Sequence, residues 1–133
     1  MASAFPSSQV ADVGCGNGKY LGFLGNRLLM VGADICRPLA VIAARKGAEV
    51  VLADCLRLPL KGGCVDHCIS IAVIHHFSRL KARVQALREL RRITRPLGTI
   101  LITVWKSQKE ECTQSPLQDV IVPFTHHVKT ETG

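Results

Sequence analysis

A glycine-rich turn near the start of the chain has the residue types and spacing of a ligand-binding loop. Asp12 is followed by three glycines at every second position, Gly14, Gly16 and Gly18. Glycine lacks a Cβ atom and adopts positive φ at little cost, so a ligand can lie directly against the backbone of such a turn. The turn follows a short apolar run at positions 10–13, which places it at the carboxyl edge of a predicted strand.

Two further acids end the next two apolar runs. Asp34 follows the run at 28–33, and Asp54 follows the run at 49–53. A carboxylate at the end of a second strand can accept hydrogen bonds from both hydroxyls of a ribose, and one at the end of a third strand can accept from the exocyclic amine of adenine. The three acids and the glycines therefore predict a site for a nucleoside cofactor.

The spacing of the glycines separates two classes of cofactor. The dinucleotide fingerprint requires glycine at position 19, where Lys19 stands, so an NAD-binding module is disfavoured. Asp12 also suits a cationic ligand better than a diphosphate, and the amino group and sulfonium of S-adenosylmethionine supply that cation. The alternative is that these residues only form turns and cap helices.

Short apolar runs alternate with helix-like stretches, which is the pattern of an α/β fold. The expected strands are residues 10–13, 28–33, 49–53, 68–74 and 99–105. The expected helices are a short one after the glycine-rich turn, residues 37–46 and residues 81–92. Because such connections are right-handed crossovers, we expect one parallel sheet with strand order 3-2-1-4-5 and helices on both faces, a Rossmann-like arrangement.

The second half of the chain defines where the fold ends. The run at 68–74 is almost wholly apolar, which is typical of a central strand covered on both faces. Pro96 would stop the last helix, because the residue before a proline disfavours helical geometry. After Trp105 the alternation fails. Residues 108–133 are polar apart from one short apolar patch, so we expect a loose tail, with one added edge strand as the alternative.

Length and charge narrow the class of protein. The chain has 133 residues, so we expect a single domain rather than a two-domain enzyme. Its net charge is +7, and the segment 79–95 holds seven basic residues against one acid, Glu89. Such a segment is either a solvated helix face or a surface that attracts nucleic acid.

The cysteines and the hydropathy pattern bear on location. Six cysteines are scattered without zinc-ligand spacing, which favours reduced thiols, no metal site and a cytoplasmic location, with the nucleus as a second compartment. No apolar run reaches the length of a transmembrane helix, so we expect no membrane partner.

Several of these features together resemble one family, the eukaryotic tRNA wobble-uridine methyltransferases, which includes the methyltransferase domain of the AlkB-homologue tRNA enzyme. The matching features are Asp12–Tyr20, Asp34, Asp54 with Cys55, the run Ile69–Phe77 before the Arg-rich helix, Arg95–Gly98, and Val104 with Trp105. The glycine motif alone marks the broad class I methyltransferases, whereas the run Ile69–Phe77 is far more specific. The resemblance covers roughly residues 8–107.

The resemblance implies an S-adenosylmethionine-dependent enzyme that methylates the carboxymethyl group of wobble uridine in tRNA. It assigns residues 1–107 to a methyltransferase domain whose sixth and seventh strands are missing. The implied partners are tRNA and a small zinc-binding activator protein that covers an apolar sheet edge. The alternative is a catalytically silent, truncated isoform that binds the cofactor or regulates a partner.

The resemblance also implies which residues hold the cofactor. The glycine-rich turn would line its methionine end, Asp34 its ribose, and Asp54 with Cys55 its adenine, while Ile71 would pass beneath the sulfonium. Tyr20 is interpreted as a packing or cofactor-covering residue. The full set of cofactor-binding positions is Asp12, Gly14, Cys15, Gly16, Gly18, Tyr20, Asp34, Ile35, Asp54, Cys55 and Ile71.

The acceptor chemistry requires little from the protein. A carboxylate is already ionised at neutral pH, so no general base is needed. His75 and His76 leave the fourth strand where the acceptor should lie, and either can donate a hydrogen bond to it; the alternative is that they order the loop or pack against Phe77. Trp105 either packs in the core or stacks on a base.

One position departs from the family pattern. Leu97 follows Pro96 where the family usually has glycine. A turn that needs positive φ there would be strained by leucine, unless the turn moves onto Gly98.

Overall fold

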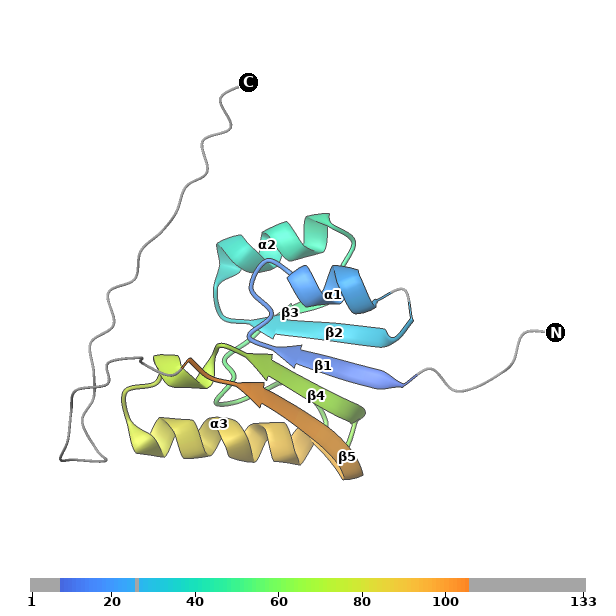
Figure 1. Ribbon diagram of the computed structural model, residues 1–133. Coiled ribbons are helices and arrows are strands. Elements are labelled where there is room, and N and C mark those ends of the chain that lie inside the picture. Colours follow the sequence, from blue (N-terminus) through green and yellow to red (C-terminus); the bar gives the residue numbers. More distant parts are fainter. Residues whose placement is uncertain (1–7, 26, 106–133) are drawn as a thin grey trace.

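The protein is a five-stranded parallel sheet flanked by helices (Figure 1). The computed structural model describes residues 8–25 and 27–105. The strand order is β3-β2-β1-β4-β5, which confirms the predicted α/β fold and topology. The strands are β1 (Gln9–Val13), β2 (Leu29–Asp34), β3 (Val50–Leu52), β4 (Val65–Ile71) and β5 (Thr94–Thr103).

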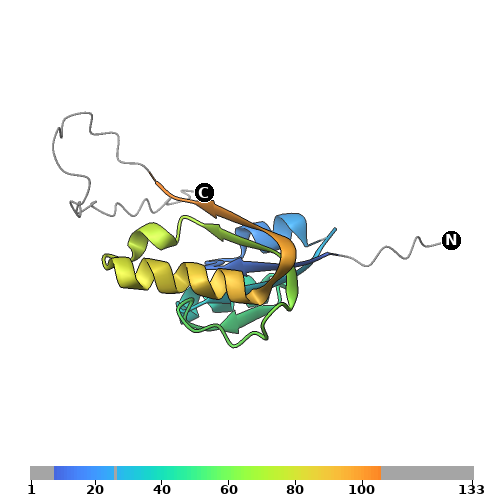
Figure 2. The same ribbon diagram turned by 90° about the horizontal axis from the view of Figure 1, so that it is seen from below.

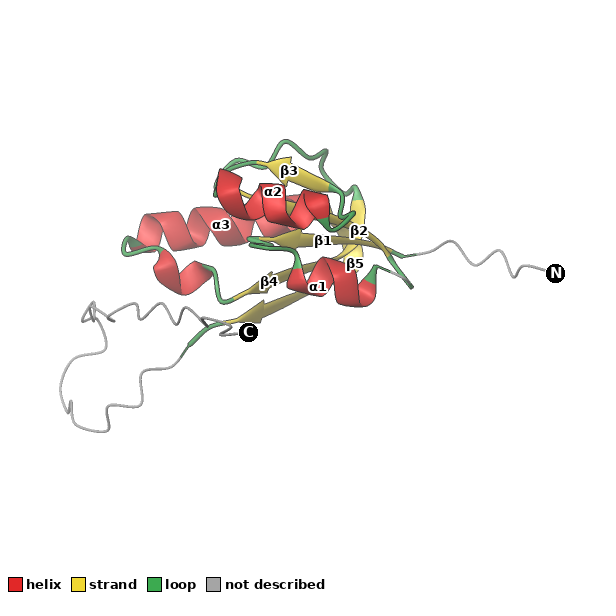
Figure 3. Ribbon diagram, turned by 90° about the horizontal axis from the view of Figure 1, so that it is seen from above, coloured by secondary structure: helices red, strands yellow, loops and turns green. Residues whose placement is uncertain are grey.

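Helices cover both faces of the sheet, as predicted. The helices are α1 (Lys19–Leu24), α2 (Arg37–Arg45), the short 3-10 helix η1 (Ile74–His76) and α3 (Leu80–Ile93). Helices α1 and α2 lie on one face, in front of the sheet in Figure 3, and α3 lies on the opposite face, in front of the sheet in Figure 2. The connection between β3 and β4 contains neither helix nor strand.

The core lies between the sheet and α3. Strand β1 is buried at its last four positions because it occupies the middle of the sheet. Leu90 and Ile93 of α3 are 2% and 0% exposed and pack with Val13 and Cys68 in one apolar cluster. Packing of this amphipathic face is what stabilises a helix as basic as α3.

The predicted bounds of the fourth and fifth strands are wrong. The fourth strand starts at Val65 rather than at position 68 and ends at Ile71 rather than at position 74, because Ala72 has a φ of +57° and the chain then turns into η1. The fifth strand starts at Thr94 rather than at position 99 and ends at Thr103. Pro96 is tolerated within this edge strand because it lies in an irregular stretch, between Thr94 and Thr99, that does not pair with β4, so its missing N–H breaks no ladder.

Leu97 adopts the strained backbone conformation that the sequence analysis considered. Its φ is +66° and its side chain is fully exposed, so the turn has not moved onto Gly98. Gly98 is required for another reason: a Cβ atom there would collide with the Asp66 carbonyl oxygen and with the side chain of Thr94.

The outer strand β5 leaves apolar side chains in solvent. Leu101 of β5 is 55% exposed, and Trp105, just beyond the end of the strand, is 77% exposed. No helix within the described ranges is long and apolar enough to cross a bilayer. The predicted tail at 108–133 and Cys112 lie outside the described residues.

Candidate cofactor and acceptor site

The glycine-rich turn forms an open cradle at the carboxyl end of β1. Gly14, Gly16 and Gly18 have φ values of +83°, +54° and +78°, as the spacing predicted. The N–H groups of Gly14 and Cys15 donate to the Ala33 carbonyl oxygen over 2.7 and 3.1 Å, which fixes the turn against β2. A Cβ atom at Gly16 would meet nothing within 4 Å, so the middle of the turn is free to take a ligand.

Asp34 ties this turn to the start of α2. Its Oδ2 accepts from the Gly16 N–H at 2.8 Å, and its Oδ1 accepts from the Cys36 N–H at 2.7 Å. Each carboxylate oxygen has a second lone pair, so both can also accept from the hydroxyls of a ribose.

Asp12 is a buried acid without a partner for one of its oxygens. The residue is 1% exposed, and no hydrogen bond reaches its Oδ2 within the described part of the chain. Burial, together with the charge of Asp34, raises the pKa of Asp12 to about 6. A buried carboxylate with an unused acceptor at the edge of an open cradle suits an ammonium group of a ligand.

The two cysteines predicted at the site are neutral thiols. Burial, followed by the charge of Asp12, raises the pKa of Cys15 to about 12. Burial and the charge of Asp54 raise the pKa of Cys55 as well. Neither thiol is therefore a nucleophile at neutral pH, and both serve as packing surface.

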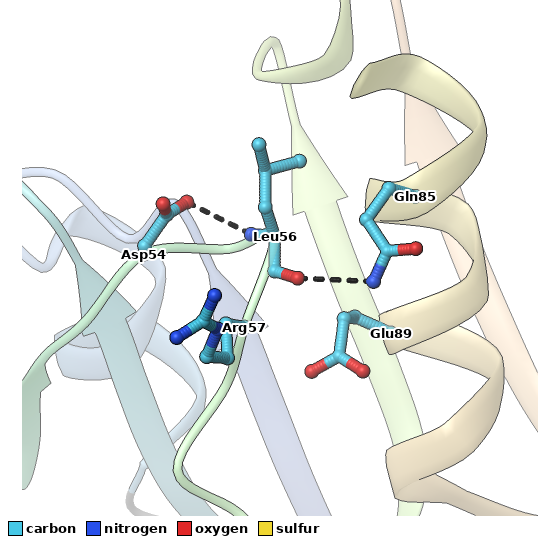
Figure 4. A pocket seen from close by; sticks show the side chains of 5 residues that line it. All are labelled: Asp54, Leu56, Arg57, Gln85 and Glu89. Atoms are coloured by element: carbon cyan, nitrogen blue, oxygen red, sulfur yellow. Dashed lines mark hydrogen bonds between the residues drawn. The ribbon is translucent and has the colours of Figure 1, made fainter. Parts of the chain in front are cut away.

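The predicted adenine side lies where β3 ends. Asp54 Oδ1 accepts from the Leu56 N–H at 2.9 Å, which leaves its other oxygen available. Ile35 is 70% exposed and presents an apolar surface at the same edge of the sheet. A hollow of about 590 Å³ lies beside Asp54, between this loop and α3 (Figure 4). It is lined by Asp54, Leu56, Arg57, Gln85 and Glu89.

The predicted acceptor side follows β4. The Ala72 N–H donates to the carbonyl and hydroxyl oxygens of Thr103, both at 3.1 Å, and so fixes the exit from Ile71. The next residue, Val73, packs so closely on Gly14 that a Cβ atom there would overlap it. The carboxyl ends of β1 and β4 are therefore joined through Val73, a residue that the sequence analysis did not identify.

The two histidines lie together on η1. Their ring centroids are 4.2 Å apart, and the ring of His75 lies 6.2 Å from that of Trp105. His75 Nδ1 is buried without a hydrogen-bond partner, and burial, then the proximity of His76, lowers the pKa of His75. His75 is half-buried, whereas His76 is exposed. Trp105, at 77% exposure, does not pack in the core.

Tyr20 lies in the first turn of α1, two residues after Gly18. Its side chain is half-buried, and Lys19 Nζ lies 5.6 Å from the centre of its ring. The position agrees with a packing residue at the rim of the cradle; contact with a cofactor stays a prediction.

Comparisons with known proteins agree with this geometry. The methyltransferase domain family matches residues 11–102, more than half of the chain. The chain belongs to the methyltransferase domain family. Its fold is therefore that of the class I methyltransferases, and the family implies S-adenosylmethionine as the methyl donor.

Relatives of this methyltransferase domain are found among tRNA-modifying enzymes. The chain is 48% identical over 108 residues to the tRNA (carboxymethyluridine(34)-5-O)-methyltransferase ALKBH8 of Mus musculus, covering 80% of this chain and 16% of that protein. It is 46% identical over 104 residues to the tRNA (carboxymethyluridine(34)-5-O)-methyltransferase of Arabidopsis thaliana, covering 78% of this chain and 26% of that protein. The chain thus spans only a small part of the relatives' length.

Two solved structures resemble this methyltransferase domain. A SAM dependent methyltransferase from Aquifex aeolicus superposes with a TM-score of 0.66 at 27% identity, over 82% of this chain and 61% of that one. A chain of the complex between the Haloferax volcanii Trm112 methyltransferase activator and a methyltransferase superposes with a TM-score of 0.65 at 23% identity, over 77% and 48%. The second likeness shows the fold alone.

Proposed function

We propose that this chain is an S-adenosylmethionine-dependent methyltransferase module that acts on the carboxymethyl group of wobble uridine in tRNA. The observation that carries the cofactor is the partnerless, buried Asp12 oxygen beside the open cradle at Gly16. The substrate is supported by the two tRNA (carboxymethyluridine(34)-5-O)-methyltransferases that are 48% and 46% identical to the chain.

Each part of such a cofactor has its own group of residues in the site. Asp12 and the glycine-rich turn bind the amino-acid end, where a buried negative charge meets an ammonium group. Asp34 accepts from the ribose with the lone pairs that Gly16 and Cys36 leave free. Ile35 and Cys55 pack against the purine, Asp54 accepts from its amine, and Ile71 lies beneath the reacting group.

The protein supplies positioning rather than proton transfer. When bound, S-adenosylmethionine supplies an electrophilic methyl group, and methylation of a carboxylate gives a methyl ester. The acceptor is ionised at neutral pH, so no residue has to deprotonate it. His75 and His76 orient the acceptor by hydrogen bonding, and the lowered pKa of His75 favours its neutral form.

The basic segment divides into two groups. Arg83, Arg92 and Arg95 are engaged within the protein, Arg95 through a 2.7 Å ion pair with Asp66. The others are exposed and make no ion pair within the described residues, so they are available to RNA phosphates. These exposed side chains are Arg79, Lys81, Arg88 and Arg91.

Partner and location complete the proposal. Both outer strands present apolar side chains, Leu52 on β3 and Leu101 on β5, each 55% exposed, and a small activator protein of the Trm112 kind covers one of these edges. The described cysteines are five free thiols, which supports a reducing compartment, the cytoplasm or the nucleus.

The test is methyl transfer by the full chain. Purified protein is incubated with radiolabelled S-adenosylmethionine and bulk tRNA from cells that lack the wobble-uridine methyl ester, with and without an activator protein. We expect label in tRNA that mild alkali releases, because esters hydrolyse and N-methyl or C-methyl groups do not. Label in protein or in small molecules would refute the tRNA assignment and leave the fold untouched.

A second candidate is a catalytically silent protein that binds the cofactor and associates through β5. The exposed Leu101 on this edge strand and the exposed Trp105 just after it favour this candidate. Binding of S-adenosylhomocysteine without any methyl transfer, even with an activator, would select this candidate over the enzyme.

A further inference from the structure

The loop between β3 and β4 is held in place by the side chains of α3. Residues 53–64 contain no helix or strand, yet they carry two of the residues assigned to the adenine, Asp54 and Cys55. A loop without internal ladders needs outside partners to keep one conformation. Those partners stand on one face of α3, at Gln85, Glu89 and Arg92.

The second part of the loop, at Leu58 and Leu60, is held by the ion pair between Glu89 and Arg92. Glu89 is 8% exposed, and its Oε2 accepts from the Leu58 N–H at 2.7 Å. Arg92 donates to both Glu89 oxygens, at 2.7 and 2.8 Å, and to the carbonyl oxygens of Leu58 and Leu60, at 2.9 and 2.8 Å. Charge-assisted, bidentate bonds of this kind define direction as well as distance.

The first part of the loop, at Leu56, is held by Gln85, the one residue of these three that bonds to it. Gln85 Nε2 donates to the Leu56 carbonyl oxygen at 3.1 Å, and the N–H of Leu56 donates to Asp54 Oδ1 at 2.9 Å. Figure 4 shows the two bonds in series, from α3 through the Leu56 backbone to the Asp54 carboxylate. The orientation of Asp54 is therefore linked to α3 through a single side-chain amide.

We propose that Gln85 is a positioning residue that aims the Asp54 carboxylate at the amine of the adenine ring, through the backbone of Leu56. The inference rests on the proposed assignment of Asp54 to the adenine. A carboxylate acceptor discriminates sharply for an amine only when its direction is fixed, because a mobile one must be ordered during binding. Gln85 supplies that order before the ligand arrives.

The experiment compares two ligands by calorimetry on the full chain. S-adenosylhomocysteine carries the adenine amine, and S-inosylhomocysteine replaces it with a carbonyl oxygen that repels Asp54. We expect the wild-type chain to prefer the adenine ligand by about tenfold or more, the factor for a hydrogen bond to a charged group. We expect Gln85→Met to lower that preference to about threefold or less, by weakening only the adenine ligand.

Two control variants define the comparison. Gln9→Met makes the same chemical change at an exposed position at the start of β1 and should alter neither affinity. Asp54→Ala should abolish the preference. Circular dichroism confirms the fold, and if Gln85→Met does not fold, Gln85→Asn, whose amide is one methylene too short to reach Leu56, replaces it.

The outcomes separate the two levels of the proposal. A preference that survives Gln85→Met, or an equal loss for both ligands, would overturn the positioning role and leave the proposed function standing. A wild-type chain that binds neither ligand would refute the proposed function, and the positioning role with it.

Discussion

Replacing Asp12 by asparagine should stabilise the ligand-free protein and abolish its affinity for the cofactor. Asp12 is 1% exposed, its Oδ2 has no partner, and burial with the charge of Asp34 raises its pKa to about 6. A raised pKa in a folded acid means that the folded state holds its proton after the unfolded state has lost it. Stability contributed by this residue is therefore lost as pH rises from about 4 to about 6 and stays lost above.

The magnitude follows from the two pKa values. A change from 3.8 to about 6 corresponds to a cost of about 3 kcal/mol for the ionised carboxylate above pH 6. The asparagine amide keeps a buried polar group without a partner, which costs about 1–2 kcal/mol. The net expectation for Asp12→Asn is a gain of about 1–2 kcal/mol at neutral pH, and no gain near pH 4, where the penalty for the acid has fallen below about 1 kcal/mol.

Urea denaturation followed by circular dichroism measures the effect, at neutral pH and near pH 4. Asp54→Asn is the matched control, because it makes the same change at an exposed acid whose Oδ1 only accepts from Leu56. The control should gain nothing at either pH. Calorimetry with S-adenosylhomocysteine on the same samples should show binding by wild type and none by Asp12→Asn.

The reasoning would be refuted by either of two results. If Asp12→Asn is less stable than wild type at neutral pH, the buried carboxylate already has a partner in the folded protein and is not available to bind a ligand. If the variant is more stable but binds S-adenosylhomocysteine as wild type does, the charge of Asp12 does not contact the ligand. A stability gain that coincides with loss of binding is the signature of a functional site.

Four further predictions concern separate parts of the fold. Asp34→Ala should weaken S-adenosylhomocysteine binding by about 1.5–3 kcal/mol in calorimetry, because it removes a charged acceptor; unchanged affinity would remove Asp34 from the site. Leu97→Gly should raise the free energy of unfolding by about 0.5–1 kcal/mol in urea, since it relieves a positive φ without burying or exposing surface, while Leu97→Ala should not. Substituting glutamine for Arg88 and Arg91 should lower the slope of log affinity for tRNA against log salt by about 1.5, and an unchanged slope would make this a solvated helix face. Arg92→Gln should instead destabilise the fold by about 2–3 kcal/mol, because Glu89 would keep a buried charge.

The sequence was informative wherever a local rule controls the chain. The glycines at 14, 16 and 18 require positive φ in any such turn, and the alternation of apolar runs with helical stretches determines a parallel sheet. It was uninformative where long-range contacts decide. No local pattern predicts that the chain leaves the sheet at Ala72. None predicts that Val73 packs on Gly14, which lies 59 positions earlier in the sequence.

The basic segment shows the same limit for charge. Seven basic residues within 79–95 predict a strong positive surface, but the count treats them alike. Arg92 and Arg95 instead bind Glu89, Asp66 and two backbone carbonyls, so their charge is partly neutralised by partners within the protein. The remaining exposed basic residues lie along α3 and at its N-cap, and the proposed function assigns contact with RNA to them. A charge-reversal experiment that includes Arg92 would therefore report unfolding rather than binding.

The two buried acids among the described residues, Glu89 and Asp12, have opposite surroundings, and the contrast separates a structural role from a proposed functional one. Glu89 receives the Leu58 N–H and the Arg92 guanidinium, and the hydrogen bond from Arg92 holds its pKa below the ordinary value. Asp12 is more deeply buried, lies near a second acid, and receives nothing at Oδ2. Because an unpaired buried charge is costly, a ligand-binding role is a physical reason for keeping one. Glu89 therefore anchors a loop, whereas the proposed function gives Asp12 a cation that the ligand supplies.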